Sequence, residues 1–251
     1  MSSVGNARAE ELHRLAEATT GFLSAAEGRV LRGAAARAAC SGLGPLLEIG
    51  SYLGRSTLFL AAGIVEAGAS TVLYSLDHHH GSEEMQAGWP DHDPSLVDAT
   101  SGKMDSLMRW RRRIEDCGAD DVVIGVLGRS EVIAANWTTP LSFVFIDGGH
   151  GAEVEWADYR GWSEKIAPGG LLAIHDVFPD PSDGGRPPYE CYLDALDSGR
   201  FVEATGYAAD SLRVLLTTGA GASNAGAESP KSMLATPPAT TSAAINTAAS
   251  E

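Results

Sequence analysis

Short apolar runs alternate with longer segments of helical periodicity along most of the chain. Five runs predict strands at 46–50, 71–77, 121–128, 141–148 and 169–176, and two more lie near 201–207 and 211–217. Helical patterns separate them at about 55–65, 103–117, 152–166 and 189–196. Runs that are apolar on both faces of a strand are typical of a parallel sheet covered by helices on both sides. The pattern therefore predicts an α/β domain.

The two ends of the chain differ from this alternating centre. Residues 6–40 have helical spacing, with Leu12, Leu15 and Ala16 on one face, and Gly21 interrupts the pattern. From about 218 to 251 the composition changes to Ala, Thr, Ser, Gly and Pro, without aromatic residues or periodicity. Such a segment cannot bury enough apolar surface to offset its conformational entropy. We expect one domain over 1–217, including the N-terminal helices, and a disordered tail over 218–251.

Two long connections interrupt the alternation, at 78–102 and 177–189. Connections of this length in a compact domain are usually functional lids or disordered segments. They contain histidines, acids, prolines and Trp89, and this composition favours ordered lids. Trp89 itself could pack against the core or stack on a sugar ring.

The charge of the chain narrows the choice of partners. A formal net charge of -15 over 251 residues disfavours nucleic acid, because its phosphates would be repelled. The three cysteines are widely spaced and predict neither a disulfide framework nor a zinc site. The first residues lack the basic start and apolar run of a signal peptide, and we expect no membrane segment. These features predict a cytoplasmic protein.

The first strand ends in a glycine-containing turn, EIGSYLGRST (48–57). Gly50 and Gly54 allow a tight turn and close approach of a ligand, and the following helix offers free N–H groups. A dinucleotide site or a purely structural turn would look similar. Glu48, directly before the turn, suits a cationic ligand better than a pyrophosphate.

Polar residues also follow the second and third strands. Asp77 ends the second strand, where an acid often accepts hydrogen bonds from ribose hydroxyl groups, although it could equally cap a turn. Ser130 follows the third strand and could cap the next helix or touch an adenine. In an open parallel sheet, ligands bind at the carboxyl ends of the strands, where these residues fall.

The fourth and fifth strands end in acids and histidines. Asp147 and His150 close the fourth strand, and His175 and Asp176 close the fifth. If these strands are neighbours, two carboxylates meet at one edge of the sheet and can bind a hard cation such as Mg²⁺. A run of three histidines, His78–His80, fits loop or substrate contacts better than metal binding, since consecutive side chains cannot easily converge on one ion.

These motifs together resemble class I S-adenosylmethionine (SAM)-dependent methyltransferases. The resemblance covers roughly 20–217 and is carried by LLEIGSYLGRST, Asp77, FIDGGH (145–150) and LAIHDVF (172–178). More narrowly, the chain is similar to the metal-dependent sugar O-methyltransferases. DHHHGSEE (77–84) and IHDVFPDPSDGGRPPYE (174–190) resemble an actinobacterial branch that includes the 1-O-methyltransferases of methylmannose polysaccharide biosynthesis. The resemblance implies a Rossmann-like fold with a seven-stranded, mostly parallel sheet, helices on both faces and extra N-terminal helices.

The resemblance also implies roles for individual residues. Contacts with SAM are implied for Glu48, Gly50, Ser51, Gly54, Ser56, Asp77, Ser130 and Asp147, and metal binding for Asp147, His175 and Asp176. His150 matches the catalytic base. Two departures are notable: Tyr52 stands where many methyltransferases have a glycine, and His175 stands where the macrolide-sugar relatives have a glutamate, a better Mg²⁺ ligand.

The activity implied is methyl transfer from SAM to a sugar hydroxyl group, at the 1-OH of a mannoside, with Mg²⁺ or another divalent cation. Asp91, Asp93 or Glu84 could accept hydrogen bonds from the saccharide. A small-molecule O-methyltransferase acting on an antibiotic sugar or a phenol is the first alternative. An NAD-dependent dehydrogenase is disfavoured because GxGxxG is absent, and a SAM-binding regulator would need no base. The N-terminal helices could cover the active site or form a homodimer face.

Overall fold

The computed structural model describes residues 3–149 and 151–218. Both His150 and the predicted tail from 219 onward lie outside the described residues, so the division into domain and tail stays a prediction. The described elements are, in order, α1 (Ser3–Glu17), α2 (Ala25–Ser41), β1 (Leu46–Ile49), α3 (Arg55–Ala67), β2 (Leu73–Asp77), η1 (Glu83–Met85), η2 (Pro94–Leu96), α4 (Leu107–Asp116), β3 (Val123–Leu127), α5 (Ser130–Asn136), β4 (Leu141–Ile146), α6 (Ala152–Ser163), β5 (Ile166–Ile174), α7 (Pro187–Asp197), β6 (Phe201–Ala209) and β7 (Leu212–Thr217).

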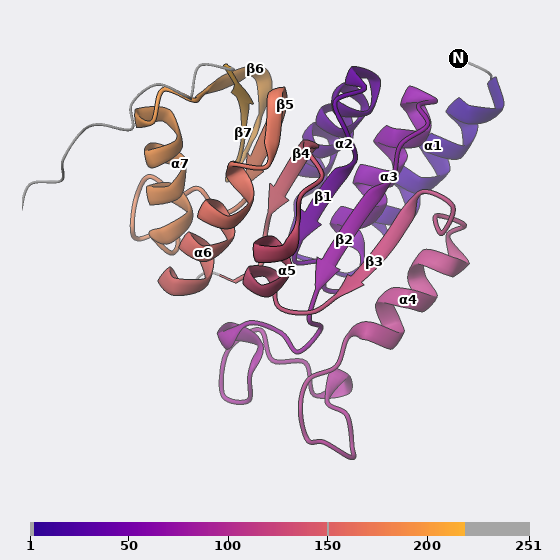
Figure 1. Cartoon of the computed structure of the whole chain (residues 1–251). Coiled ribbons are helices and arrows are strands. Elements are labelled where there is room, and N and C mark those ends of the chain that lie inside the picture. Colours follow the sequence, from indigo (N-terminus) through magenta and orange to yellow (C-terminus); the bar gives the residue numbers. More distant parts are fainter. Residues whose placement is uncertain (1–2, 150, 219–251) are drawn as a thin grey trace, which may run out of the picture. The chain divides into compact units, whose positions relative to one another are not determined.

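The described strands form one seven-stranded sheet in the order β3-β2-β1-β4-β5-β7-β6 (Figure 1). The first five strands in the chain pair in parallel, whereas β7 runs antiparallel to both β5 and β6. The strand order reverses between β1 and β4, and such a reversal opens a crevice at the carboxyl ends of the strands. The prediction of a mostly parallel sheet with helices on both faces is confirmed.

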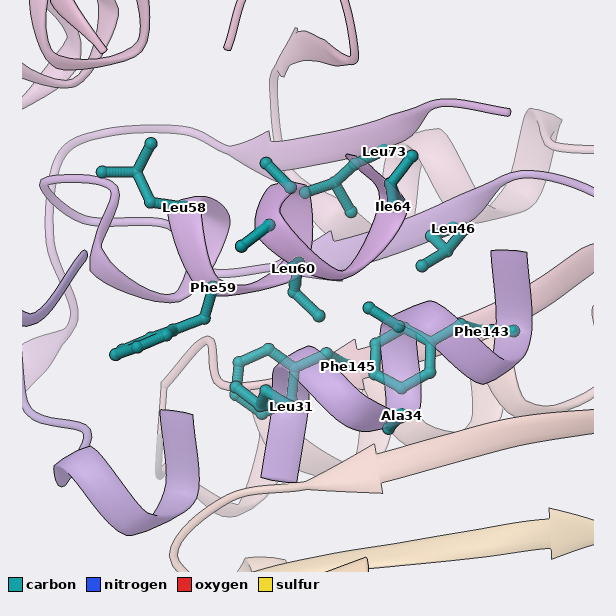
Figure 2. Close-up of a cluster of buried hydrophobic side chains, with 14 of the residues drawn as sticks. Leu31, Ala34, Leu46, Leu58, Phe59, Leu60, Ile64, Leu73, Phe143 and Phe145 are labelled. Atoms are coloured by element: carbon teal, nitrogen blue, oxygen red, sulfur yellow. The ribbon is translucent and has the colours of Figure 1, made fainter. Parts of the chain in front are cut away.

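Successive side chains of β4 point to opposite faces of the sheet and contribute to the apolar layer on each face. Phe143 and Phe145 pack on one face with side chains of α1, α2 and α3, including Leu31 and Phe59 (Figure 2). Val144 and Ile146 pack on the other face with residues of α6 and α7. Every residue of β4 is buried, as the continuous apolar run at 141–146 predicted.

Arg55 links the end of α1 and the connection between α1 and α2 to the glycine turn. Arg55, the first residue of α3, donates to the carbonyl oxygens of Glu17 and Thr19 at 2.8 Å, and to that of Leu23 at 2.8 Å. Glu17 ends α1, where helix geometry leaves the last carbonyl groups without intrahelical partners, and Thr19 and Leu23 belong to the connection that follows. Arg55 therefore holds the connection between α1 and α2 against the sheet edge that carries the candidate site.

One helix was not predicted from the sequence, and two other features bear on earlier expectations. The sequence pattern did not define α5, whose seven residues are too few for a periodic signal. The long connection after β2 contains two short 3-10 helices and an antiparallel bridge between Val97 and Met104, and it extends beyond the carboxyl ends of the strands (Figure 1). Among the described residues, no helix combines the length and the apolar character needed to cross a membrane.

Candidate active site

A cavity of about 880 Å³ opens at the carboxyl ends of β1, β2, β4 and β5. The glycine turn, the ends of these strands and the connection after β2 contribute to its wall, and so does the segment between α1 and α2 through Thr20, Gly21, Phe22 and Leu23. The predicted site residues that line it are Gly50, Ser51, Ser56, Asp77, Ser130, Asp147 and Asp176. Glu48, Gly54 and His175 lie outside the lining, and of the N-terminal segment it is the connection between α1 and α2 that contributes to the wall.

Gly50 is required by the close approach of two strands. Its φ is 84°, and a Cβ atom there would lie 2.1 Å from the carbonyl oxygen of Asp147. The end of β1 therefore touches the end of β4 directly, which brings Asp147 to the turn. The following Tyr52 also has a positive φ, of 46°, and its ring lies 5.5 Å from that of Phe22 at the cavity wall.

Asp77 organises the glycine turn from the end of β2. Its Oδ2 accepts hydrogen bonds from the backbone N–H groups of Ser51 at 2.9 Å and Tyr52 at 3.0 Å, and its Oδ1 accepts one from His79 at 2.7 Å. Burial alone would raise the pKa of Asp77, but the His79 charge and these N–H groups lower it below its usual range. The carboxylate is thus held ionised at the cavity wall, in the place where sequence reasoning expected a ribose contact.

Glu48 takes a different position from the one expected of a cofactor contact. Its side chain is fully buried below the turn, where Oε2 accepts hydrogen bonds from Thr57 at 2.6 Å and Ser75 at 2.7 Å. Burial raises the pKa of Glu48 to about 7, and the charge of Asp147 adds to the shift. Glu48 therefore ties β1, β2 and α3 together behind the cavity. A strand-end acid in the sequence cannot reveal on which side of the sheet its carboxyl group lies.

The raised pKa of Glu48 predicts a pH-dependent stability. Because the folded state favours the protonated carboxyl group, its contribution is complete below the ordinary pKa of 4.5 and is lost as the pH rises through about 7. Relative to wild type, Glu48→Gln should gain about 3 kcal/mol in free energy of unfolding between pH 4.5 and pH 8. Urea unfolding of both proteins in EDTA at the two pH values measures this gain. An equal difference at both pH values would contradict the assignment.

Ser130 lines the cavity but does not cap α5, so the interpretation of Ser130 as a helix cap was wrong. The N-cap position belongs to Arg129, and Ser130 Oγ instead accepts a hydrogen bond from Trp162 Nε1 at 2.8 Å. It also bonds Asp158, a buried residue of α6 that lines the cavity. Burial raises the pKa of Asp158 to about 6. Sequence reasoning missed Asp158, although its i, i+4 spacing from Trp162 places both on one helix face.

Asp147 and Asp176 meet at the edge of the sheet because β4 and β5 are paired neighbours. His175 Nδ1 lies 2.9 Å from Asp147 Oδ1 and 3.4 Å from Asp176 Oδ2. One ligand atom from each of these three residues falls within 4.8 Å of the other two. Asp176 has a φ of 55°, a strained value that tends to occur at functional sites. The three residues for which metal binding was predicted therefore converge in the fold.

The electrostatics of this cluster suit a cation. Burial alone would lower the pKa of His175, but the carboxylates of Asp147, Asp176 and Glu27 raise it well above its ordinary value. Three carboxylates around one imidazole leave the cluster negative even when His175 is protonated. Two carboxylate groups and an imidazole are a donor set that divalent cations accept. The residues present thus fit the metal that the sequence implied.

The connection after β2 contains the histidine run His78–His80 and Trp89, for which the sequence left alternatives open. His79 is buried and its Nδ1 lies 2.8 Å from Ser106 Oγ, and His80 Nδ1 lies 2.9 Å from the Met104 carbonyl oxygen. These contacts agree with the loop interpretation of His78–His80, of which His78 lines the cavity. Trp89 is 47% exposed and lies outside the cavity lining.

Comparison with known proteins identifies the family. A family described as a methyltransferase domain matches residues 47–177, which is more than half of the chain. The chain belongs to this methyltransferase family. The matched region runs from β1 to the residue after Asp176 and includes both the glycine turn and the acidic edge.

Solved structures agree with the family. An O-methyltransferase from Bacillus cereus in complex with SAH has 17% identity and a TM-score of 0.54, over 86% of this chain and 92% of that chain. TomG from Streptomyces achromogenes, involved in tomaymycin synthesis and solved with SAM, has 17% identity and a TM-score of 0.53, over 87% and 92%. The O-methyltransferase NovP has 17% identity and a TM-score of 0.59, over 78% and 81%. At such identities the likeness shows the fold, which agrees with a methyltransferase domain.

Proposed function

We propose that this methyltransferase transfers the methyl group of SAM to a hydroxyl group of a neutral saccharide, at the 1-OH of a mannoside, with the help of a divalent cation. The observation that carries the proposal is the cluster of Asp147, His175 and Asp176 beside a cavity that the glycine turn and Asp77 also line. Methyl transfer to oxygen needs a cofactor site and a means of activating a hydroxyl group next to each other. The glycine turn and the acidic cluster lie at the same edge of the sheet, which supports the proposal.

Different residues would bind the cofactor and the metal. Asp77 would accept hydrogen bonds from the ribose of SAM, the turn at Gly50 would allow close approach of the cofactor, and Ser130 would contact the adenine. Asp147, His175 and Asp176 would hold Mg²⁺ or another divalent cation, which when bound lowers the pKa of a hydroxyl group. The methyl group of SAM is already electrophilic, so the protein must align the acceptor and remove its proton.

We assign the removal of that proton to His150. A histidine that is neutral near pH 7 can accept a proton as the methyl group transfers. His150 lies outside the described residues, and its role rests on the sequence motif. Its described neighbours Gly149 and Gly151 both line the cavity, as does Gly148. Residues without side chains at these positions leave space for an acceptor.

The charge of the cavity favours a neutral acceptor. Acidic residues outnumber basic ones along its wall, with Glu83, Glu84, Asp91, Glu131 and Glu153 in addition to the site acids. Phosphorylated sugars and coenzyme A esters would be repelled there, whereas the sulfonium cation of SAM would be attracted. Carboxylates that accept hydrogen bonds from hydroxyl groups, together with the aromatic rings of Phe22 and Tyr52, suit a saccharide.

Methyl transfer from labelled SAM to matched acceptors tests this proposal. We expect a labelled product from oligomannosides with a free 1-OH and none from the corresponding 1-O-methyl mannosides, in which that hydroxyl group is blocked. Mannose 1-phosphate should also give no product. Transfer to catechols or other phenols, with none to mannosides or glucosides, would contradict the saccharide assignment and favour a small-molecule O-methyltransferase.

A further inference from the structure

Glu27 places a third carboxylate against His175 from an element far away in sequence. It lies in the first turn of α2, and both side chains are buried, with 3% of Glu27 and 5% of His175 exposed. Glu27 Oε1 is 3.3 Å from His175 Nε2, on the opposite side of the ring from Asp147. Among the described residues this nitrogen has no other acceptor and no fully aligned hydrogen bond. The imidazole is thus enclosed by acids on both sides.

The two ring nitrogens of His175 therefore have different surroundings. Nδ1 faces Asp147 and Asp176, whereas Nε2 faces Glu27. A histidine that binds a metal must present an unprotonated nitrogen to it, and a carboxylate at the other nitrogen fixes the proton there. We propose that Glu27 is a positioning residue for the metal site, which holds the proton of His175 on Nε2 and directs Nδ1 toward Asp147 and Asp176. This inference rests on the metal site of the proposed function.

The position of Glu27 is itself fixed by two other contacts. Its Oε2 accepts a hydrogen bond from the Ser24 backbone N–H at 2.8 Å, which completes a capping box at the start of α2. Its Oε1 accepts hydrogen bonds from Ser211, at 2.8 Å from the hydroxyl group and 3.1 Å from the backbone N–H. Both carboxylate oxygens are thus anchored, and the side chain has little freedom. Helix α2, which carries Glu27, would in this way help to position the metal site.

The alternative is that Glu27 only stabilises the start of α2, and a matched variant separates the two roles. Glu27→Gln keeps the size of the side chain but removes the charge that faces His175. Ser24→Ala removes the capping hydroxyl group, whose Oγ accepts from the Glu27 backbone N–H at 3.1 Å and donates to Asp210 at 2.6 Å, and it leaves the Glu27 carboxylate in place. Both variants should lower the Tm, so stability alone does not distinguish them.

Metal affinity is the readout that distinguishes them. Mn²⁺ binding to the full chain, followed by electron paramagnetic resonance, should weaken about 10- to 100-fold in Glu27→Gln and change less than about threefold in Ser24→Ala. The ¹⁵N chemical shifts of the His175 ring, assigned with His175→Gln, should report a proton on Nε2 in the Mg²⁺-loaded wild type. At the same Mg²⁺ concentration they should report a larger fraction of metal-free imidazole, with a proton on Nδ1, in Glu27→Gln.

Each outcome bears on a different claim. Equal loss of Mn²⁺ affinity in both variants, or unchanged affinity in Glu27→Gln, would overturn the positioning role while leaving the metal site intact. Failure of the wild type to bind Mn²⁺, Mg²⁺ or Co²⁺ at millimolar concentrations would overturn the metal site and, with it, the role of Glu27. SAM binding, measured in parallel, should be unchanged in both variants, which confirms that the cavity is folded.

Discussion

His150→Ala is expected to reduce methyl transfer by about 10²- to 10⁴-fold, the usual contribution of a positioned general base. The affinity for SAM should stay within about twofold of wild type, because the cofactor contacts that we assign come from other residues. Single-turnover transfer from labelled SAM, together with equilibrium binding of SAM, measures the two quantities separately. The loss should shrink as the pH rises, since hydroxide can replace a missing base.

Another histidine provides the control for this variant. His78 lines the cavity, and we assign it no proton transfer. His78→Ala should therefore keep the rate within about tenfold of wild type. Near-normal turnover of His150→Ala would remove that histidine from the mechanism. A large loss in His78→Ala instead would move the base to the connection after β2.

Gly50→Ala is expected to be the most damaging single substitution in the glycine turn. The new Cβ would lie 2.1 Å from the carbonyl oxygen of Asp147, so the ends of β1 and β4 would have to separate. Left-handed backbone costs an alanine about 1 kcal/mol, and the steric overlap should raise the total loss in free energy of unfolding to about 3 kcal/mol or more. Because Asp147 moves with the turn, affinity for SAM and for metal should both fall.

Gly68→Ala isolates the backbone contribution. Gly68 ends α3 with a φ of 62°, and a Cβ there would meet no atom within 4 Å. This variant should lose only about 1 kcal/mol and bind SAM normally. Urea unfolding and SAM binding of the two variants give the comparison. Equal losses in Gly50→Ala and Gly68→Ala would contradict the view that contact between the strand ends constrains the turn.

The sequence predicted those parts of the fold whose signals are local. Buried strands such as 141–146 were readable as continuous apolar runs, and the break at Gly21 separated α1 from α2. The acidic edge was also predictable, because parallel neighbouring strands must end at the same side of the sheet. Asp147 and Asp176 therefore followed from topology alone, once β4 and β5 were taken as neighbours.

The parts that the sequence did not predict depend on long-range packing. Glu27 and His175 are separated by 148 positions and meet only because α2 packs over the end of β5. No local sequence pattern therefore predicts this contact. Glu48 sits next to the glycine turn in sequence, yet its side chain lies behind the sheet edge with Thr57 and Ser75. Trp89 looked suited to stacking, whereas Phe22, Tyr52 and Phe178 supply aromatic rings to the cavity wall.

The central claim is that the acidic edge formed by Asp147, His175 and Asp176 holds a metal that methyl transfer requires. The most direct test is transfer of the labelled methyl group of SAM to an oligomannoside with a free 1-OH, before and after treatment with EDTA. Our account predicts that EDTA abolishes transfer, that Mg²⁺ or Mn²⁺ restores it, and that Asp176→Asn is not restored at the same metal concentration. Transfer at an unchanged rate in EDTA would contradict the account and leave these acids a structural role only.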